Sequence, residues 1–236
     1  MANGMIHFGN LFKKKADVIP AVGKVRFGDL RRLTPISQHY GYDRGGPVDR
    51  YYIEKFLENC RGDIKGRVLE IKGNGYTKKF GGAKVAVSDV LDNDKQNPNA
   101  NIIADLTKAD QIAPNMYDCV IITQVLQYIF DYRAVIQTVH RILKPGGVFL
   151  LTVPGITQTA DQKEGAVWYW TFYEASVKKV LGEFFPAISI NVDIHGNVLV
   201  ATAFLYGMTV DELTVEEYDY NDPNYQLILT ARAVKG

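Results

Sequence analysis

Short apolar segments alternate with stretches of helical periodicity along most of this chain, and the alternation restricts the folds it can adopt. The clearest apolar segment, 117-YDCVIIT-123, is almost continuously apolar, which predicts a strand buried on both faces of a sheet. Strands that alternate with helices form a parallel sheet with helices on both sides. We therefore expect an α/β fold with a doubly wound, mostly parallel, seven-stranded sheet.

The individual elements follow from periodicity and from the residues that begin and end helices. The strands are expected at 67–71, 84–88, 101–104, 117–123, 148–153, 187–193 and 225–233. Helices are expected at 47–60, where Pro47 opens the helix, after an Asp131 cap, after a capping box of Thr171 and Glu174, and at 198–206. The Pro-Gly-Gly run 144-KPGG-147 is expected to end the second of these helices.

Loop-rich residues 1–46 are interpreted as an N-terminal arm or lid, and residues 47–236 as the main domain. The net charge of +1 favours neither nucleic acid nor a membrane surface as a partner. No signal peptide and no apolar run long enough for a membrane span are apparent, so a cytoplasmic location is expected. The oligomeric state stays open. Cys60 and Cys119 lie in apolar patterns typical of buried structural thiols.

Ligands on doubly wound sheets bind beyond the carboxyl ends of the strands, near the switch in strand order. This rule selects the residues that follow the expected strands: Glu70 to Gly75, Asp89, Asp105, Thr123 to Gln127, and the segment after Val153. The loop 72-KGNGYTKKFGG-82 therefore lies where a cofactor is expected. A dinucleotide fingerprint needs a third glycine, but Lys78 occupies that place, which disfavours NAD. A plain turn that needs two glycines is the alternative.

Three acids stand at the ends of the first three expected strands, and each has a plausible place against an adenosine ligand. Asp89 is expected to accept hydrogen bonds from both ribose hydroxyls, and Asp105 from an adenine amine, with Leu106 packed on the ring. Glu70 is expected near the amino-acid end of such a ligand. Each acid alone is also consistent with an ordinary strand-end cap.

In these residues and their spacing, the chain resembles the class I S-adenosylmethionine-dependent methyltransferases, of the small methyltransferase-domain type. The resemblance covers about residues 40–234 and is carried by 68-VLEIKGNGYTKKFGG-82, 105-DL-106, 117-YDCVIITQVLQYI-129 and 139-VHRILKPGGVFLLTVPG-155. It implies the Rossmann-like fold of that family and S-adenosyl-L-methionine as cofactor. Two further segments, 42-YDRGGPVDRYYIEKFLE-58 and 168-WYWTFYE-174, are similar to a subgroup associated with glycans.

The resemblance implies that Glu70 and the following Lys72, Gly73 and Asn74 contact the methionine portion of the cofactor. Gln124 and Gln127 stand where it implies cofactor and substrate contacts, and Thr123 precedes them at the strand end. The family commonly has E-x-G-x-G-x-G, whereas this chain places Lys72, Asn74 and Tyr76 at the glycine positions. A lysine that points inward would either meet the methionine carboxylate or fill the site.

Aromatic side chains are expected beside the ligand, where their faces attract a sulfonium or stack on a flat substrate. Tyr42 is a candidate for the cofactor, and Trp168, Tyr169 and Trp170 are candidates for the substrate. The alternative is that these residues pack as a hydrophobic lid.

An oxygen nucleophile needs a base, and the candidates are His39 and His195, while His140 is interpreted as structural. No cluster has metal-ligand spacing, so no metal is expected. The predicted function is O-methylation of a carbohydrate, glycan or other small metabolite. A catalytically silent binding or assembly module and an NAD-linked oxidoreductase remain alternatives.

Overall fold

The computed structural model describes residues 19–159 and 167–236 of the chain. The chain divides into two units, Met1–Thr34 and Pro35–Gly236. The described part of the first unit contains one short 3-10 helix, Gly28–Leu30. Residues 35–46 of the predicted arm belong to the second unit, so the arm at 1–46 and its role as a lid stay predictions.

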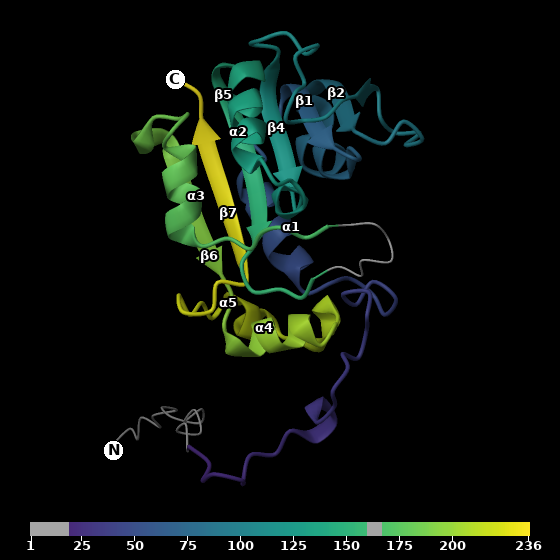
Figure 1. The fold of residues 1–236 in the computed structure, drawn as a ribbon, viewed down its shortest axis with the longest axis vertical. Helices are drawn as coiled ribbons and strands as arrows, with labels where there is room; N and C mark the ends of the chain where they lie inside the picture. Colours follow the sequence, from purple (N-terminus) through teal and green to yellow (C-terminus); the bar gives the residue numbers. More distant parts are fainter. Residues whose placement is uncertain (1–18, 160–166) are drawn as a thin grey trace, which may run out of the picture. The chain divides into compact units, whose positions relative to one another are not determined.

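The second unit contains the predicted seven-stranded, mostly parallel sheet (Figure 1). Its strands are β1 Gly66–Ile71, β2 Val85–Asp92, β3 Ile102–Ile103, β4 Tyr117–Thr123, β5 Leu143–Pro154, β6 Ile190–His195 and β7 Ile228–Val234. Their order across the sheet is β3-β2-β1-β4-β5-β7-β6, and β7 is antiparallel to both of its neighbours. The strand order reverses between β1 and β4, which puts the switch point at the middle of the sheet.

Helices cover both faces of this sheet because side chains of the central strands alternate between them. Val120 and Ile122 of β4 pack on one face with α2 (Tyr132–Ile142) and α3 (Glu174–Leu181). Cys119 and Ile121 pack on the other face with α1 (Asp49–Asn59). Figure 1 shows α1 on the opposite side of the sheet from α2 and α3.

A third apolar cluster lies beyond the carboxyl ends of β4 and β5, where α4 (Val198–Leu205) and α5 (Val215–Asp219) pack together (Figure 1). The segment before α1 joins this cluster, since Val48 is fully buried and Pro47 forms a bridge to Thr209. The cluster therefore covers part of the end of the sheet at which the carboxyl ends of the parallel strands meet.

Several expected boundaries were wrong, and one of them matters for function. β2 continues three residues past Asp89 to Asp92, because Val90 and Leu91 pair with β1 as regular strand residues. β5 begins at Leu143 and includes the Lys-Pro-Gly-Gly run, whose Gly146 has a φ of 76°.

The start of α3 also differs from the predicted capping box of Thr171 and Glu174. The helix begins at Glu174, and the Ser176 hydroxyl bonds the backbone N–H and C=O of Tyr173. The segment after β1 forms only a short π-helical turn, Thr77–Gly81. Within the described residues, no helix is both long and apolar enough to cross a bilayer.

Gly155 follows β5 at the covered end of the sheet and has no room for a side chain. A Cβ there would lie 1.9 Å from the Gln226 carbonyl oxygen, whereas a Cβ at Gly62 would meet no described residue within 4 Å. We expect Gly155→Ala to lower the free energy of unfolding by about 2 kcal/mol or more, as overpacking does. Gly62→Ala is the matched control and should stay close to the parent in urea unfolding. Equal stabilities for the two variants would contradict the close approach.

Candidate ligand-binding cavity

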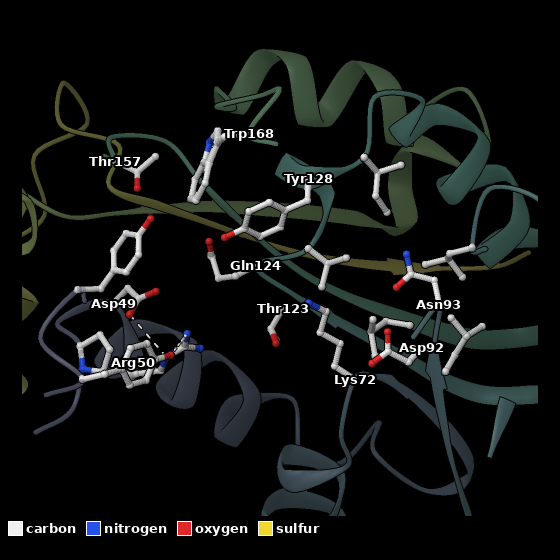
Figure 2. A pocket seen from close by; sticks show the side chains of 18 of the residues that line it. Asp49, Arg50, Lys72, Asp92, Asn93, Thr123, Gln124, Tyr128, Thr157 and Trp168 are labelled. Carbon is white, nitrogen blue, oxygen red and sulfur yellow. Dashed lines mark hydrogen bonds and ion pairs between the residues drawn. The ribbon is translucent and has the colours of Figure 1, made fainter. Parts of the chain in front are cut away.

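A cavity of about 520 Å³ lies at the carboxyl ends of the central strands. Its wall includes Ile71 at the end of β1, Asp92 at the end of β2 and Thr123 at the end of β4. Figure 2 shows Asp92 and Asn93 toward one end and Thr157 and Trp168 toward the other, with Thr123, Gln124 and Tyr128 between them. The volume lies in the usual range of small-molecule sites.

Strained backbone is concentrated in the cavity wall. Four non-glycine residues in the described part of the chain have a positive φ, and three of them line the cavity: Tyr40 at 57°, Lys72 at 65° and Gln124 at 54°. The left-handed conformation costs a residue with a side chain about 1–2 kcal/mol. Such strain persists only where the surrounding structure enforces it, and it clusters at ligand sites.

Asp92 is the carboxylate that the structure places at the end of β2, in the cavity wall next to Asn93. Its Oδ2 accepts a hydrogen bond from Asn97 Nδ2 at 2.7 Å, and its Oδ1 accepts one from the Asp94 N–H at 3.2 Å. Burial acts to raise the pKa of Asp92, but these hydrogen bonds outweigh it and hold the pKa below its usual value. Asp92 is therefore an ionised acceptor with lone pairs left for a ligand.

Asp89, the predicted ribose partner, lies away from the cavity. Its carboxylate accepts hydrogen bonds from Arg67 Nε and Asn101 Nδ2, each at 2.7 Å, and from the Tyr117 hydroxyl at 3.1 Å. Because β2 continues to Asp92, Asp89 lies within the strand rather than at its tip. Its buried carboxylate ties together β1, β2, β4 and the segment before β3.

Asp105 and Leu106, predicted to hold an adenine, both line the cavity. Leu106 is buried, and Asp105 is exposed. The Thr107 hydroxyl and N–H both donate to Asp105 Oδ1, and these bonds hold the pKa of Asp105 below its usual value.

Glu70 stabilises the loop after β1 rather than lining the cavity. It accepts hydrogen bonds from the Thr77 N–H at 2.8 Å, from the Thr77 hydroxyl at 2.7 Å and from the Tyr76 N–H at 3.3 Å. Burial raises the pKa of Glu70 despite these bonds. Gly73 and Asn74 also lie outside the described cavity wall, and Asn74 donates to Ser88.

Lys72 is the residue of this loop that lines the cavity, and it extends into it (Figure 2). Its φ of 65° is the left-handed conformation in which glycine is favoured. The chain therefore keeps the backbone shape of a glycine loop at this position and adds a cationic side chain. The cavity retains about 520 Å³ with Lys72 in its wall, so the lysine does not fill it.

Asp49 and Arg50, the first residues of α1, form the charged part of the wall near Gln124 (Figure 2). Arg50 donates to the Tyr42 hydroxyl at 2.7 Å and to the Tyr76 hydroxyl at 3.1 Å. Asp49 is only 5% exposed, and its Oδ1 lacks a hydrogen-bond partner among the described residues. The Arg50 Nε lies 3.6 Å from that oxygen, which is an ion pair without a hydrogen bond.

Of the predicted aromatic residues, Tyr42 and Trp168 line the cavity, and Tyr169 and Trp170 do not. Trp168 contacts Tyr128 edge to face, with ring centroids 4.9 Å apart. Tyr169 and Trp170 instead pack around Phe130, and Trp170 Nε1 donates to the Phe130 carbonyl.

The turn after β4 positions both glutamines. Gln124 lines the cavity, and its N–H donates to the Thr152 carbonyl at 3.0 Å. Gln127 is 1% exposed and lies behind the wall, where its amide donates to Gln124 Oε1 at 3.4 Å. The backbone carbonyl of Gln127 accepts a hydrogen bond from the Tyr169 N–H at 2.8 Å, which links the aromatic segment to the turn.

The two histidines predicted as bases both lie outside this cavity. His195 ends β6 at the far edge of the sheet, where its ring stacks on Tyr52 and its Nε2 lies 2.9 Å from the Thr230 hydroxyl. Burial lowers the pKa of His195. It contributes instead to a second cavity of about 440 Å³. His39 is exposed and outside the described cavity wall. No group of three or more metal-ligating side chains occurs in the part of the chain that the structure describes.

The sequence reasoning missed Asp49, Arg50, Asp92, Asn93 and Tyr128. A signal for Asp92 was present, because the apolar pair Val90-Leu91 continues the strand and the polar run 92-DNDKQNPN-99 follows it. For Asp49 there was no signal, since an acid in the first turn of a helix is ordinarily a solvated residue that favours the helix dipole.

A family profile and several solved structures are similar to this chain. A sequence profile described as "Methyltransferase domain" matches residues 45–194, more than half of the chain. No curated protein matches the sequence significantly.

Three solved structures illustrate the similarity in fold. A SAM-dependent methyltransferase from Archaeoglobus fulgidus is 12% identical with a TM-score of 0.52, over 79% of this chain and 94% of that one. The N-methyltransferase NodS from Bradyrhizobium japonicum, in complex with S-adenosylhomocysteine, is 15% identical with a TM-score of 0.50, over 81% and 89%. Phosphoethanolamine N-methyltransferase 2 from Haemonchus contortus, in complex with S-adenosylmethionine, is 16% identical with a TM-score of 0.51, over 89% and 55%.

The position of Asp89 leads to a stability prediction. Asp89→Ala leaves the buried Tyr117 hydroxyl and the Asn101 amide without their acceptor, so we expect the free energy of unfolding to fall by about 2–3 kcal/mol. The exposed Asp110 supplies a control, and Asp110→Ala should unfold at the same urea concentration as the parent. An Asp89→Ala variant as stable as the parent would show that the network is not a structural one.

Proposed function

We propose that this chain, which belongs to the methyltransferase domain family, transfers a methyl group from S-adenosylmethionine to an oxygen of a carbohydrate or another small metabolite. The main observation that supports the proposal is the cavity across the carboxyl ends of β1, β2 and β4. Acidic and amide groups lie toward one end of it, cations lie in its wall, and aromatic and hydroxyl groups lie toward the other end.

The adenosine fits the end that contains Asp92. The Asp92 carboxylate accepts hydrogen bonds from the ribose hydroxyls, and Asn93 lies beside it. The adenine packs among apolar side chains of the same wall, namely Leu91, Ala104, Leu106 and Ile129. Asp105, at the rim, accepts from the exocyclic amine. A planar apolar ring with a polar edge suits this combination.

The middle of the cavity holds the amino-acid part of the cofactor. Lys72 and Arg50 supply positive charge for its carboxylate. Gln124, held by Gln127, presents an amide at the switch between β1 and β4. When bound, the cofactor supplies a methyl group on a positively charged sulfur, which becomes a neutral thioether after transfer. The residues of the chain mainly have to align the two reactants and exclude water.

The acceptor binds at the end lined by Trp168, Tyr128 and Thr157. Aromatic faces stack on the apolar face of a sugar or on a small phenol, and the Thr157 hydroxyl bonds an acceptor hydroxyl. This mixture supports a neutral polyhydroxylated or phenolic acceptor. The same features support O-methylation of a carbohydrate, which agrees with the similarity of two segments to a glycan-associated subgroup.

Calorimetry with S-adenosylmethionine, S-adenosylhomocysteine and NAD tests the proposal against its alternatives. We expect both adenosyl-sulfur ligands to bind and NAD not to bind. Binding of none of them would favour a silent module, and binding of NAD alone an oxidoreductase. A screen for methyl transfer from labelled S-adenosylmethionine to sugars, lipid-linked glycans and small phenols then identifies the acceptor.

Asp92 gives the sharpest test of the cofactor site. We expect Asp92→Ala to weaken S-adenosylhomocysteine binding by about 1–3 kcal/mol, because the ribose hydroxyls lose a charged acceptor. The exposed Asp94, two residues away and outside the described cavity wall, is the control, and Asp94→Ala should bind as the parent does. If the two variants bind equally well, Asp92 is not the ribose partner.

A further inference from the structure

The cavity wall contains an aspartate, Asp49, with a buried carboxylate oxygen that has no hydrogen-bond partner among the described residues. Of the three acids in the described wall, Asp92 accepts from Asn97 and Asp94, and Asp105 accepts from Thr107. Asp49 is buried to the same extent as Asp92, with 5% of its surface exposed, but its Oδ1 has no hydrogen-bond partner among residues 19–159 and 167–236. A buried polar atom without a partner is costly, so its presence at a cavity points to a ligand group that completes it.

We propose that Asp49 lies at the point of methyl transfer and takes the proton from the hydroxyl of the methyl acceptor. The inference rests on the proposed methyltransferase function and adds the residue that activates the nucleophile. It replaces His39 and His195, which lie outside the cavity wall that the structure describes.

The side chains around Asp49 attract its carboxylate without donating to Oδ1. Arg50 uses its two terminal nitrogens on the hydroxyls of Tyr42 and Tyr76, and its Nε approaches Asp49 Oδ1 only to 3.6 Å. Asp49 is also the first residue of an 11-residue helix, whose dipole favours a negative charge. Positive potential is therefore present, while no described side chain donates a hydrogen bond to Asp49 Oδ1.

Burial raises the pKa of Asp49 above its usual value, although Arg50 and the N–H groups of the helix start act in the opposite direction. A carboxylate with a raised pKa is a stronger base, which suits proton abstraction. The other titratable groups near Asp49 are Arg50 and the phenols of Tyr76, Tyr128 and Tyr218. Burial raises the pKa of all three phenols, so they stay neutral where Asp49 titrates.

The step balances in atoms and charge. The acceptor O–H bond breaks and an O–H bond forms on the Asp49 carboxylate, while the electron pair of the acceptor oxygen makes the new O–CH₃ bond. The C–S electron pair stays on sulfur. The negative charge of Asp49 and the positive charge of the sulfonium are both cancelled, and the carboxylic acid returns its proton to water after the products leave.

A binding experiment tests the position of Asp49 without a known acceptor. Sinefungin carries an ammonium where S-adenosylmethionine carries its methyl group, whereas S-adenosylhomocysteine carries nothing there. We expect the parent to bind sinefungin more tightly than S-adenosylhomocysteine. In Asp49→Asn the affinity for sinefungin should fall by about tenfold or more, as expected on losing a charge-assisted hydrogen bond. The affinity for S-adenosylhomocysteine should stay within about twofold because it makes no such bond.

Glu58→Gln is the matched control, because it makes the same acid-to-amide change on an exposed position of the same helix. Equal losses for both ligands in Asp49→Asn would overturn the proposal, since Asp49 would then bind a group common to both, such as the α-ammonium. Unchanged affinity for both would overturn it as well. If the parent binds neither ligand, the proposed function itself fails, which is a distinguishable result.

The pH dependence of the same affinities provides a second readout. Sinefungin needs the ionised carboxylate, so its preference over S-adenosylhomocysteine is present above the folded-state pKa of Asp49 and is lost as the pH falls through it. Because that pKa is raised, we expect the loss to begin at a higher pH than for an ordinary aspartate. In Asp49→Asn the ratio of the two affinities should not vary with pH. A parent ratio that starts to fall only at the pH where an ordinary aspartate is protonated would contradict a raised pKa.

Stability and turnover separate a role in catalysis from a structural one. A raised folded-state pKa means that ionised Asp49 opposes folding at neutral pH, so Asp49→Asn should melt no lower than the parent. With the acceptor found by the transfer screen, kcat should fall by about 100-fold or more while KM changes little. A lower melting temperature with normal kcat would assign Asp49 to the fold.

Discussion

The parallel pairing of β1 between β2 and β4 is the constraint on which the rest of this structure depends. It brings the ends of three strands that are far apart in the sequence to one edge of the sheet, at the point where the strand order reverses. The buried Asp89 carboxylate reinforces this arrangement, because it joins Arg67 of β1 to Tyr117 of β4. A cavity at this edge follows from the topology, and the loops decide what it binds.

The loop after β1 shows how such a site tolerates an unusual sequence. Glu70 holds the loop through three hydrogen bonds to Tyr76 and Thr77, and Lys72 takes the left-handed conformation in which glycine is favoured. The backbone shape is therefore preserved without the glycine. The strain at Lys72 has a counterpart at Gln124 across the same cavity, so the site is built on two enforced backbone positions.

Polar groups in and around the cavity differ in how completely the fold satisfies them. Asp89 has hydrogen bonds from three side chains, and Asp92 is held by Asn97 and by its own turn. These acids are fixed in direction before any ligand arrives. Asp49 is buried, and within the described part of the chain its Oδ1 has no hydrogen-bond partner, which is a cost to stability located in the wall of the cavity. This contrast separates residues that hold the site together from the residue that is left to react.

The sequence alone determined the order of strands and helices along the chain, because alternation with period two and helical periodicity are local properties. It also predicted a ligand site formed by the residues after β1, β3 and β4, and Lys72, Asp105, Leu106, Thr123 and Gln124 line one cavity. It did not determine which of two aspartates in β2 reaches the edge, since strand length depends on pairing with a neighbour. Only the tertiary structure decided that Asp49 is buried beside the strand ends and that His195 lies at the far edge of the sheet. Burial and hydrogen-bond satisfaction are set by segments distant in sequence, and no local pattern encodes them.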